Sequence, residues 1–291
     1  MAREKTEHPA PPGPVRAPQA GTRFTAVEIH DNIRGPGEAE LQRPVAALFW
    51  SALASGLVIG FSFLAGGYVA SLAPPHLRHA AAAAVYPLGF MFVIMARSEL
   101  FTENTLVPVI PFLNRRDRET FRRLMRVWAT LLVGNLLGAL VYSLVLSRTP
   151  MVAGHLHPAL LEIAVRATEG GFWLVAYQAV FAGWLIALLS WLLGATRATG
   201  AQLVLIWLTT APIAAFTFRH SIAGAVEAFY RAAEGHAGWG AMLGEFVVPA
   251  VLGNAVGGVL LVALLNYSQV AAEQEPSSEP RHGEEGRRDL A

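Results

Sequence analysis

The chain of 291 residues contains no cysteine, which excludes disulfide bonds, thiolate metal sites and cysteine nucleophiles. Charged residues are also scarce, at 15% of the sequence, whereas soluble proteins usually contain about 25%. The formal net charge of +1 says little about partners, because in such a composition the position of charges matters more than their sum. A secretory signal peptide is not expected, since the N-terminal segment is rich in proline and polar residues and has no short apolar core.

Apolar residues dominate what is present. They make up 54% of the chain, and the mean hydropathy is +0.42, which is typical of a polytopic membrane protein. Because a helix needs about 20 apolar residues to cross the hydrocarbon core, the sequence predicts an all-α fold with six spans. The expected spans are 45–72, a second from Ala80 that is interrupted at Arg97, 124–146, 172–193, a fifth from Leu203 that is interrupted at TFRHS, and 242–265.

Polar segments flank the predicted six-helix transmembrane channel domain, which we place at residues 45–267. Residues 1–22 are rich in proline and cannot bury an apolar face, so we expect a disordered N-terminal tail. Residues 23–44 set a few apolar side chains among charges, which predicts a cytoplasmic amphipathic segment with a short surface helix before Pro44. Residues 268–291 are again polar, and we expect a disordered cytoplasmic C-terminal tail.

The arginines predict the orientation of the chain in the membrane. The loop between the second and third spans contains a cluster of them: Arg115, Arg116, Arg118, Arg122, Arg123 and Arg126. Since basic residues gather on the cytoplasmic side, we expect both termini in the cytoplasm of a protein in the cell (inner) membrane. The loop is interpreted as a topology signal that contacts lipid headgroups, and not as a nucleic-acid surface.

The two halves of the sequence repeat one arrangement. GNLLGAL begins at Gly134 in the third span and GNAVGGV begins at Gly253 in the sixth, so both contain G-N-x-x-G. Small residues at this spacing allow helices to approach closely in lipid. Thr102 and His220 precede the two motifs by nearly the same interval, and both lie where polar residues break a span. Three spans per half make an inverted 3+3 repeat, and matching broken helices in such a repeat point to a midplane site.

The polar interruptions themselves predict a pore. RSELFTENT (97–105) and TFRHS (217–221) place charged and polar residues at the depth of the membrane. Non-helical backbone is tolerated there only if it is buried in protein or faces water. Two such breaks, one from each half, would meet near the centre of the protein, so we expect a pore or binding site lined by ELFT (99–102) and FRHS (218–221).

These segments resemble the formate/nitrite transporter family. SELFTENT is similar to the family's second-helix break, FRHSIAG to its fifth-helix break with a central histidine, and VPAVLGNAVGG to its sixth-helix motif. AVEIHDNIRGPGEAELQRP resembles a less characterised branch of the family. The resemblance covers about residues 25–270, with the four motifs in the same order.

The resemblance implies an aquaporin-like fold of six helices with broken second and fifth helices, assembled as a homopentamer with one pore in each protomer. The implied substrates are small weak-acid anions or their conjugate acids, and the implied protein is not an enzyme and needs no cofactor. By motif, Leu100, Phe101 and Thr102 would form a constriction on the cytoplasmic side and its polar wall. His220 would be the central histidine, and Ile213 the second apolar constriction. Thr102 could also cap the helix that resumes after the break.

Several positions depart from the pattern of the family. The family often has a glutamate where Arg219 precedes the histidine, and asparagine at the positions of Gly183 and Gly224. The family's vestibule lysine has no clear match here, although Arg166 stands nearby. These departures bear on which anion passes and on gating, while the central histidine and the threonine are retained.

The charged residues of the breaks have more than one interpretation. Glu99 could pair with Arg97 or Arg219, or accept hydrogen bonds from exposed amides, and so support the break. Arg219 could steer anions or only pair with Glu99. Asn135 and Asn254, from the two G-N-x-x-G motifs, complete the expected supporting residues. No metal site is expected, because the histidines of HLH lack enough partners.

Three other functions are compatible with the composition. An intramembrane hydrolase needs a serine and a histidine in a suitable geometry, but Ser221 directly follows His220 and no G-x-S-x-G elbow occurs. A neutral-solute channel of the aquaporin type carries paired N-P-A motifs, which this sequence lacks. A nonconducting protein of the same fold is a further alternative. The sequence also does not decide among formate, nitrite, hydrosulfide, lactate and acetate as substrates, or between a channel and proton-coupled transport.

Overall fold

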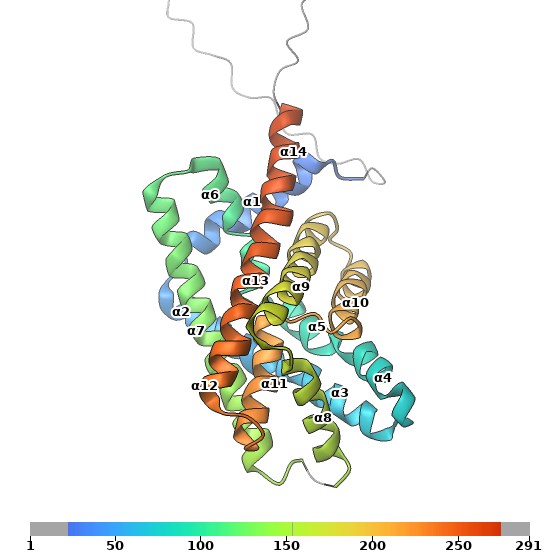
Figure 1. Cartoon of the computed structure of the whole chain (residues 1–291). Helices are drawn as coiled ribbons and strands as arrows, with labels where there is room; N and C mark the ends of the chain where they lie inside the picture. The colour runs from blue at the N-terminus through green and yellow to red at the C-terminus, as the bar shows by residue number, and fades with distance from the viewer. Residues whose placement is uncertain (1–22, 153, 275–291) are drawn as a thin grey trace, which may run out of the picture.

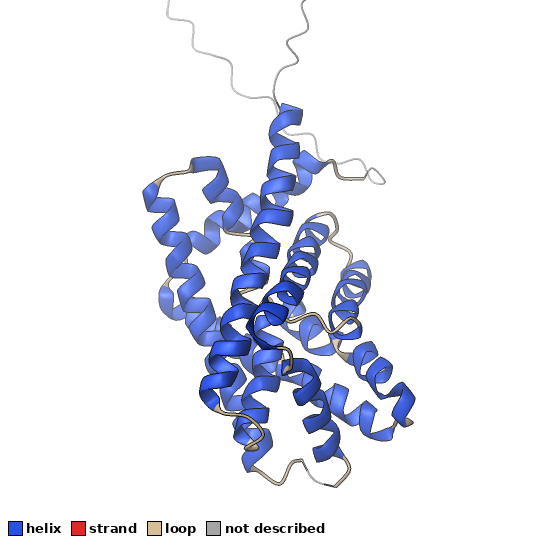
Figure 2. Cartoon of the chain, viewed as in Figure 1, coloured by secondary structure: helices blue, strands red, loops and turns tan. Residues whose placement is uncertain are grey.

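A computed structural model describes residues 23–152 and 154–274 of the chain. These residues form a bundle of helices joined by loops, and no strand occurs among them (Figure 1, Figure 2). The tail predicted at 1–22 and residues 275–291 of the predicted C-terminal tail lie outside the described residues.

The described helices fall into two groups, one in each half of the sequence. The first half contains α1 (Ala26–Gln42), α2 (Val45–Val58), α3 (Gly60–Leu72), η1 (Pro75–Leu77), α4 (Arg78–Val85), α5 (Pro87–Met95), η2 (Glu103–Thr105), α6 (Val109–Arg115) and α7 (Arg118–Arg148). The second half contains α8 (Leu156–Thr168), α9 (Gly171–Gly194), α10 (Thr199–Ala215), α11 (Ser221–Ala233), α12 (Trp239–Ala241), η3 (Met242–Val247), α13 (Val248–Gly258), η4 (Val259–Leu264) and α14 (Leu265–Gln274).

Five helical segments of the described residues are long and apolar enough to cross a membrane. They are Val45–Leu72, Pro75–Met95, Arg118–Arg148, Gly171–Gly194 and Trp239–Gln274. These segments correspond to all the predicted spans except the fifth. In its place lies α10, an apolar helix of 17 residues that stops at the second break, after which α11 continues. The last segment includes two π-helical turns, η3 and η4.

The two G-N-x-x-G motifs make the same helix contact in each half. α7 packs along α2, and α13 packs along α9. An added Cβ at Gly134 would lie 2.7 Å from the Cβ of Ala52, and one at Gly253 would lie 2.6 Å from the Cβ of Ala179. Both glycines are therefore required by the close approach of two helix backbones, as expected for small residues in a membrane bundle.

Helix α1 begins with a capping box and is packed onto the bundle. The Thr25 hydroxyl accepts from the Glu28 amide, and the Glu28 carboxylate accepts from the Thr25 amide. The helix predicted before Pro44 is therefore present. It is more than a surface helix, because Ile33 and Leu41 are buried and α1 packs against α6, α9 and α14.

The C-terminal helix α14 continues to Gln274, so the tail boundary predicted at residue 268 was too early. The extension is supported by contact with α1 and by the burial of Val270. The described start of α1 and the end of α14 lie at the same end of the molecule, together with α6 (Figure 1). The six spans predicted from the sequence, an even number, would place the two ends on one side in this way.

Candidate functional site

The chain leaves helical geometry at two places with the same backbone pattern. After α5, Arg97 has a left-handed φ of 58°, and after α10, Thr217 has a φ of 54°. In each case the next amide donates back to a carbonyl in the last helical turn, over 3.0 Å from Ser98 and 2.8 Å from Phe218. This is the Schellman arrangement of a helix C-terminus. The two breaks therefore have equivalent backbone geometry, as the inverted repeat predicts.

Replacing Thr217 by glycine should stabilise the protein by about 1 kcal/mol. A left-handed conformation costs an L-residue about 1–2 kcal/mol, whereas glycine adopts it without steric cost. Among the described residues, the Thr217 hydroxyl bonds only the adjacent Phe216 carbonyl, over 2.7 Å, so little is lost. Thermal unfolding in detergent should show Tm a few degrees higher, while the control Thr209→Gly, inside α10, should lower it. A T217G protein with lowered Tm would contradict a strained backbone here.

Asn135 of α7 holds the first break in shape. Its Oδ1 accepts a hydrogen bond from Phe101 N over 2.8 Å. Its Nδ2 donates to the carbonyls of Ala52 and Glu99 over 2.8 and 2.9 Å. The side chain is fully buried, and one amide thus satisfies a donor and an acceptor that the broken helix leaves unpaired.

Asn254 of α13 does the same at the second break. Its Oδ1 accepts from Ser221 N over 2.7 Å, and its Nδ2 donates to the carbonyls of Ala179 and Arg219 over 2.8 and 2.9 Å. This asparagine is also fully buried. The asparagine of each G-N-x-x-G motif therefore binds the break in its own half of the chain.

These matched bonds fix the register between the two halves. Glu99 and Arg219 give their carbonyls to the two asparagines, so Leu100 is the counterpart of His220. The comparison of the two halves of the sequence aligned Thr102 with His220, which differs by two positions from the register in the structure. The displacement arises because Thr102 and His220 meet across the molecule, as contact partners and not as equivalent residues.

His220 and Thr102 form the direct contact between the two breaks. His220 Nε2 and Thr102 Oγ1 lie 2.8 Å apart, and both residues are buried. His220 is also the N-cap of α11, because its Nδ1 accepts from the amides of Ile222 and Ala223 over 3.2 and 3.1 Å. An Nδ1 that accepts two hydrogen bonds carries a lone pair, so the ring proton lies on Nε2 and is donated to Thr102.

Apolar side chains surround this polar pair. The Phe90 ring meets the His220 ring edge to face, with centroids 5.0 Å apart. Leu100 and Ile213, two of the predicted constriction residues, are fully buried. Phe101 lies differently, because its ring packs against Trp128 of α7 with centroids 5.8 Å apart. The structure therefore orients the Phe101 ring toward the neighbouring helix.

Two cavities approach the pair from opposite sides. The outer cavity, lined by α3, α4, α8 and the second break on the side away from α1, includes Ile213 and His220 in its wall. The inner cavity, about 620 Å³ between α1, the first break and the start of α10, is lined by Glu99 and Glu103. Residues 100–102 are buried and line neither cavity. The Thr102–His220 contact thus lies in the closed layer between the cavities.

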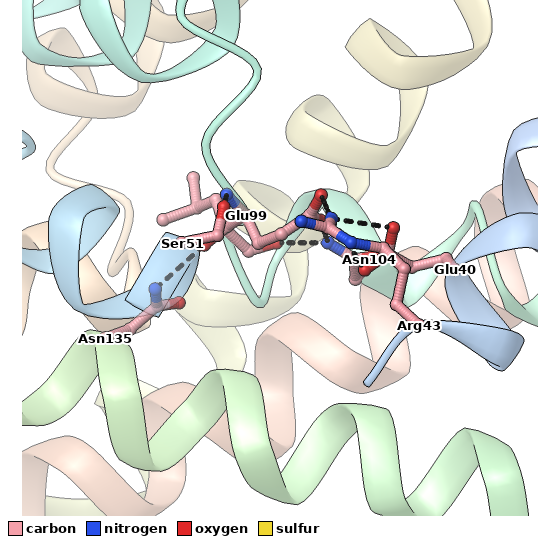
Figure 3. A network of polar contacts seen from close by, with 7 residues as sticks. Glu40, Arg43, Ser51, Glu99, Asn104 and Asn135 are labelled. Carbon is pink, nitrogen blue, oxygen red and sulfur yellow. Dashed lines mark hydrogen bonds and ion pairs between the residues drawn. The ribbon is translucent and has the colours of Figure 1, made fainter. Parts of the chain in front are cut away.

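Glu99 connects the first break to the N-terminal helix. Its carboxylate accepts from Arg43 Nη1 over 2.6 Å and from Asn104 Nδ2 over 2.9 Å. Arg43 Nη1 also bonds the Glu40 carboxylate over 3.1 Å. Figure 3 shows these side chains together on one side of the first break, with Asn135 on the other side. The network ties the end of α1 to the wall of the inner cavity.

Neither Arg97 nor Arg219 pairs with Glu99, so that expectation from the sequence was wrong. Arg219 donates Nη1 to the Arg166 carbonyl over 3.0 Å and Nη2 to the Glu169 carbonyl over 2.9 Å. The reason is position, since Arg219 lines the outer cavity and Glu99 lines the inner one. Arg97 lines the inner cavity, but no ion pair to it occurs within the described part of the chain.

Burial and the charge of Glu99 raise the pKa of Glu40 to about 7, against the opposing effect of the hydrogen bond from Arg43. Glu40 lies on α1, outside the membrane-spanning segments, and Glu103 is a further carboxyl close enough to act on the group. A carboxyl with a raised pKa in the folded protein stabilises it at low pH. This contribution is fully present below the unfolded value of about 4.5 and is lost as the pH rises through about 7.

The packing of α1 should therefore weaken by about 1–3 kcal/mol between pH 5 and pH 8. Hydrogen–deuterium exchange over residues 26–42, corrected for intrinsic rates, measures this change as a loss of protection. Glu40→Gln should remove most of the pH dependence, since the amide does not titrate. Equal protection of wild-type α1 at both pH values would show that Glu40 does not control its packing.

Sequence reasoning missed the polar partners of the first break and one helix of the outer cavity. Arg43 stands just before the first span, a place where a basic residue reads as a topology signal, and Asn104 lies within the quoted motif without a distinctive pattern. Helix α8 lies between two predicted spans and was not predicted as a helix, yet it packs against α3 and α11. Its apolar periodicity, LHPALLEIAVRAT, is the signal that could have identified it.

The arrangement around His220 does not form a hydrolytic pair. Both ring nitrogens are engaged, with Thr102 and with the N-cap amides. The Ser221 hydroxyl is buried and has no hydrogen-bond partner within the described residues, so His220 does not activate it as a nucleophile. What the geometry does offer is a buried N–H donor and a hydroxyl group in an apolar layer between two cavities.

The family model described as formate/nitrite transporter matches residues 27–268. The chain belongs to the formate/nitrite transporter family. This family consists of transporters and channels, so this member is a transport protein and not an enzyme. The family match covers both breaks and both G-N-x-x-G motifs. The chain is a multi-pass membrane protein with the predicted all-α inverted-repeat fold.

Individual relatives agree with this assignment. The chain is 34% identical to inner membrane protein YfdC of Escherichia coli K12 over 246 residues, which cover 84% of this chain and 79% of YfdC. It is 31% identical to a probable formate transporter of Methanothermobacter thermautotrophicus over 243 residues, covering 73% and 88% of the two chains.

Solved structures show the same fold. An FNT family ion channel superimposes with a TM-score of 0.68 at 18% identity, covering 84% of this chain and 98% of the channel. A pentameric formate channel with formate bound gives a TM-score of 0.67 at 20% identity, covering 78% and 98%. At these identities the structural similarity establishes the aquaporin-like fold of this family member.

Proposed function

We propose that this family member conducts small monovalent anions of weak acids, or their conjugate acids, through a pore centred on Thr102 and His220. Formate and nitrite are the first candidates, because relatives with those names share the fold and the family. The single observation that carries the proposal is the 2.8 Å contact of His220 Nε2 with Thr102 Oγ1 in a closed apolar layer between two cavities.

The apolar layer sets the energetic problem that the pair addresses. An unpaired anion transferred from water to an apolar environment loses many kcal/mol of hydration free energy. Leu100 and Ile213, both fully buried, contribute apolar side chains to this layer. An anion in this layer therefore has to receive hydrogen bonds from the protein or to cross as its neutral acid.

His220 and Thr102 can supply those hydrogen bonds. The proton on His220 Nε2 points at Thr102 Oγ1, and an anion that enters between them would accept it in place of the hydroxyl. The Thr102 hydroxyl can rotate to donate a second hydrogen bond to the same anion. A second proton on Nδ1 would displace the two N-cap amides of α11, so the geometry favours His220 as a neutral donor.

Assembly and orientation belong to the same proposal. We expect a homopentamer, because the solved formate channel of this fold is pentameric. Apolar side chains such as Val133 and Leu252 are 59% and 54% exposed on the protomer, as surfaces facing lipid or neighbouring protomers would be. We place both termini in the cytoplasm of the inner membrane, since the arginine-rich loop is on their side.

Stopped-flow flux in proteoliposomes tests the proposed function. The wild-type protein should accelerate uptake of formate or nitrite over protein-free liposomes, and the panel should include hydrosulfide, lactate and acetate with and without a pH gradient. Dependence on the pH gradient separates proton-coupled transport from a channel. If none of the anions moved faster than in protein-free liposomes, the protein would be a nonconducting member of the family.

A further inference from the structure

The outer cavity holds an arginine that the proposed pore does not use. Arg219 is only 6% exposed and lines this cavity beside His220. Its Nη1 and Nη2 each donate to a backbone carbonyl, over 3.0 and 2.9 Å. Its Nε is buried without a hydrogen-bond partner in the described part of the chain. A guanidinium has five N–H donors, so donors of Arg219 are left for a ligand.

The geometry of the break does not require a positive charge at this position. The equivalent residue in the first half is Glu99, which has the opposite charge and the same backbone bond to an asparagine. Asn254 satisfies the backbone at the second break without help from the Arg219 side chain. The cost of burying this guanidinium therefore calls for another explanation.

The other charged groups of the outer cavity leave Arg219 available. Arg78 and Arg166 share the carboxylate of Glu162, with N···O distances of 3.2 and 3.7 Å. Glu227 lines the cavity and is 7% exposed. Among the described residues it forms neither an ion pair nor a hydrogen bond, so more than 4.0 Å separates it from Arg219. A buried cation and a buried carboxyl thus face one cavity without contact.

We propose that Arg219 forms an outer binding site for a small monovalent carboxylate, one step before the Thr102–His220 contact. The carboxylate would accept charge-assisted hydrogen bonds from the free donors of the guanidinium. The cavity volume of about 80 Å³ restricts this site to small ligands. The choice of ligand rests on the proposed function, and the site extends that function by a selectivity step at its outer entrance.

Glu227 has a defined part in this site. In its ionised form Glu227 would compete with a bound carboxylate for Arg219 and keep the affinity low enough for the anion to leave toward His220. Removing that charge should tighten carboxylate binding, whereas removing the charge of Arg219 should weaken it. Substitutions of the two residues should therefore change carboxylate affinity in opposite directions, although both residues line one cavity. A purely structural role for either residue would not produce such opposite changes.

Direct titration of detergent-solubilised protein with sodium formate, by calorimetry, tests the site without depending on transport. Arg219→Gln should weaken formate binding by at least about tenfold, and at an alkaline pH where Glu227 is ionised Glu227→Gln should strengthen it several-fold. Arg148→Gln is the matched control, because Arg148 is exposed, bonds the Ala233 carbonyl at the end of α11 and is not part of the cavity. Size-exclusion profiles establish that each variant is folded.

The outcomes separate this site from the proposed function. Formate affinity unchanged in R219Q, or absent in the wild type, would overturn the site even if the flux measurement showed transport. Formate binding that depends on Arg219 would support the site even if no flux were seen. Where R219Q does not fold, E227Q decides alone, because unchanged or weakened binding in that variant contradicts the competition between Glu227 and the ligand.

Discussion

Replacing His220 by asparagine should lower formate flux about ten- to hundredfold while the protein stays folded. Asparagine is among the best N-cap residues, so its Oδ1 can replace Nδ1 as the acceptor for the amides of Ile222 and Ala223. Its shorter side chain does not place a donor where Nε2 meets Thr102. A lost hydrogen bond to an anion is worth about 1.5–3 kcal/mol, which corresponds to the stated decrease in flux.

Two companion variants interpret the result. His220→Ala removes both the N-cap and the donor, so it should lose flux and also unfold at a lower temperature. His236→Asn changes an exposed histidine in the loop after α11 and should leave both quantities unchanged. Proteoliposome flux measured beside Tm separates the two roles of His220. Wild-type flux in H220N would mean that His220 serves the pore only as a helix cap.

Replacing Asn254 by alanine should destabilise the protein by about 3 kcal/mol or more. The asparagine makes three buried hydrogen bonds, to the amide of Ser221 and to the carbonyls of Ala179 and Arg219. Each buried polar group left without a partner costs about 1–3 kcal/mol, and Asn254 is fully buried. Asn135→Ala should behave alike, since it breaks the equivalent set of bonds.

Aspartate at the same positions refines this experiment. Asn254→Asp preserves size and the Oδ1 acceptor but replaces two donated bonds by contact of a carboxyl group with two carbonyl oxygens. It should therefore also lower Tm, whereas Ser190→Ala, which removes one bond to Ile186 O inside α9, should have a small effect. Thermal unfolding in detergent is the measurement. A Tm for N254A equal to that of S190A would show that the break keeps its shape without the asparagine.

The sequence was sufficient for the fold because its signals are local and periodic. Long apolar segments predicted the membrane spans, and the polar interruptions at RSELFTENT and TFRHS predicted the two breaks. The G-N-x-x-G glycines indicated close helix contact, and the structure places Gly134 and Gly253 against α2 and α9. The length of α14 was underestimated, because contact with α1 prolongs a helix whose own sequence is polar.

The site was predictable in part for the same reason. His220 and Thr102 were identified from their motifs, and the structure brings them into contact. The partner of Glu99 was not predictable, because Arg43 is distant in sequence and reaches the break only when α1 packs on the bundle. In the sequence, any nearby arginine could be the partner of the Glu99 carboxylate. Only the separation of the inner and outer cavities in the structure excludes Arg219 as that partner.

The absence of cysteine allows a direct test of where the pore lies. Thr102→Cys introduces one thiol into a chain that has none, and methyl methanethiosulfonate then adds a small group at the Thr102–His220 contact. Formate flux through T102C should fall to the level of protein-free liposomes after modification, while wild-type flux stays unchanged. Mass spectrometry gives the extent of labelling, and an exposed control, Thr149→Cys, should conduct with or without it. Complete labelling of T102C with undiminished flux would contradict a pore at Thr102 and His220.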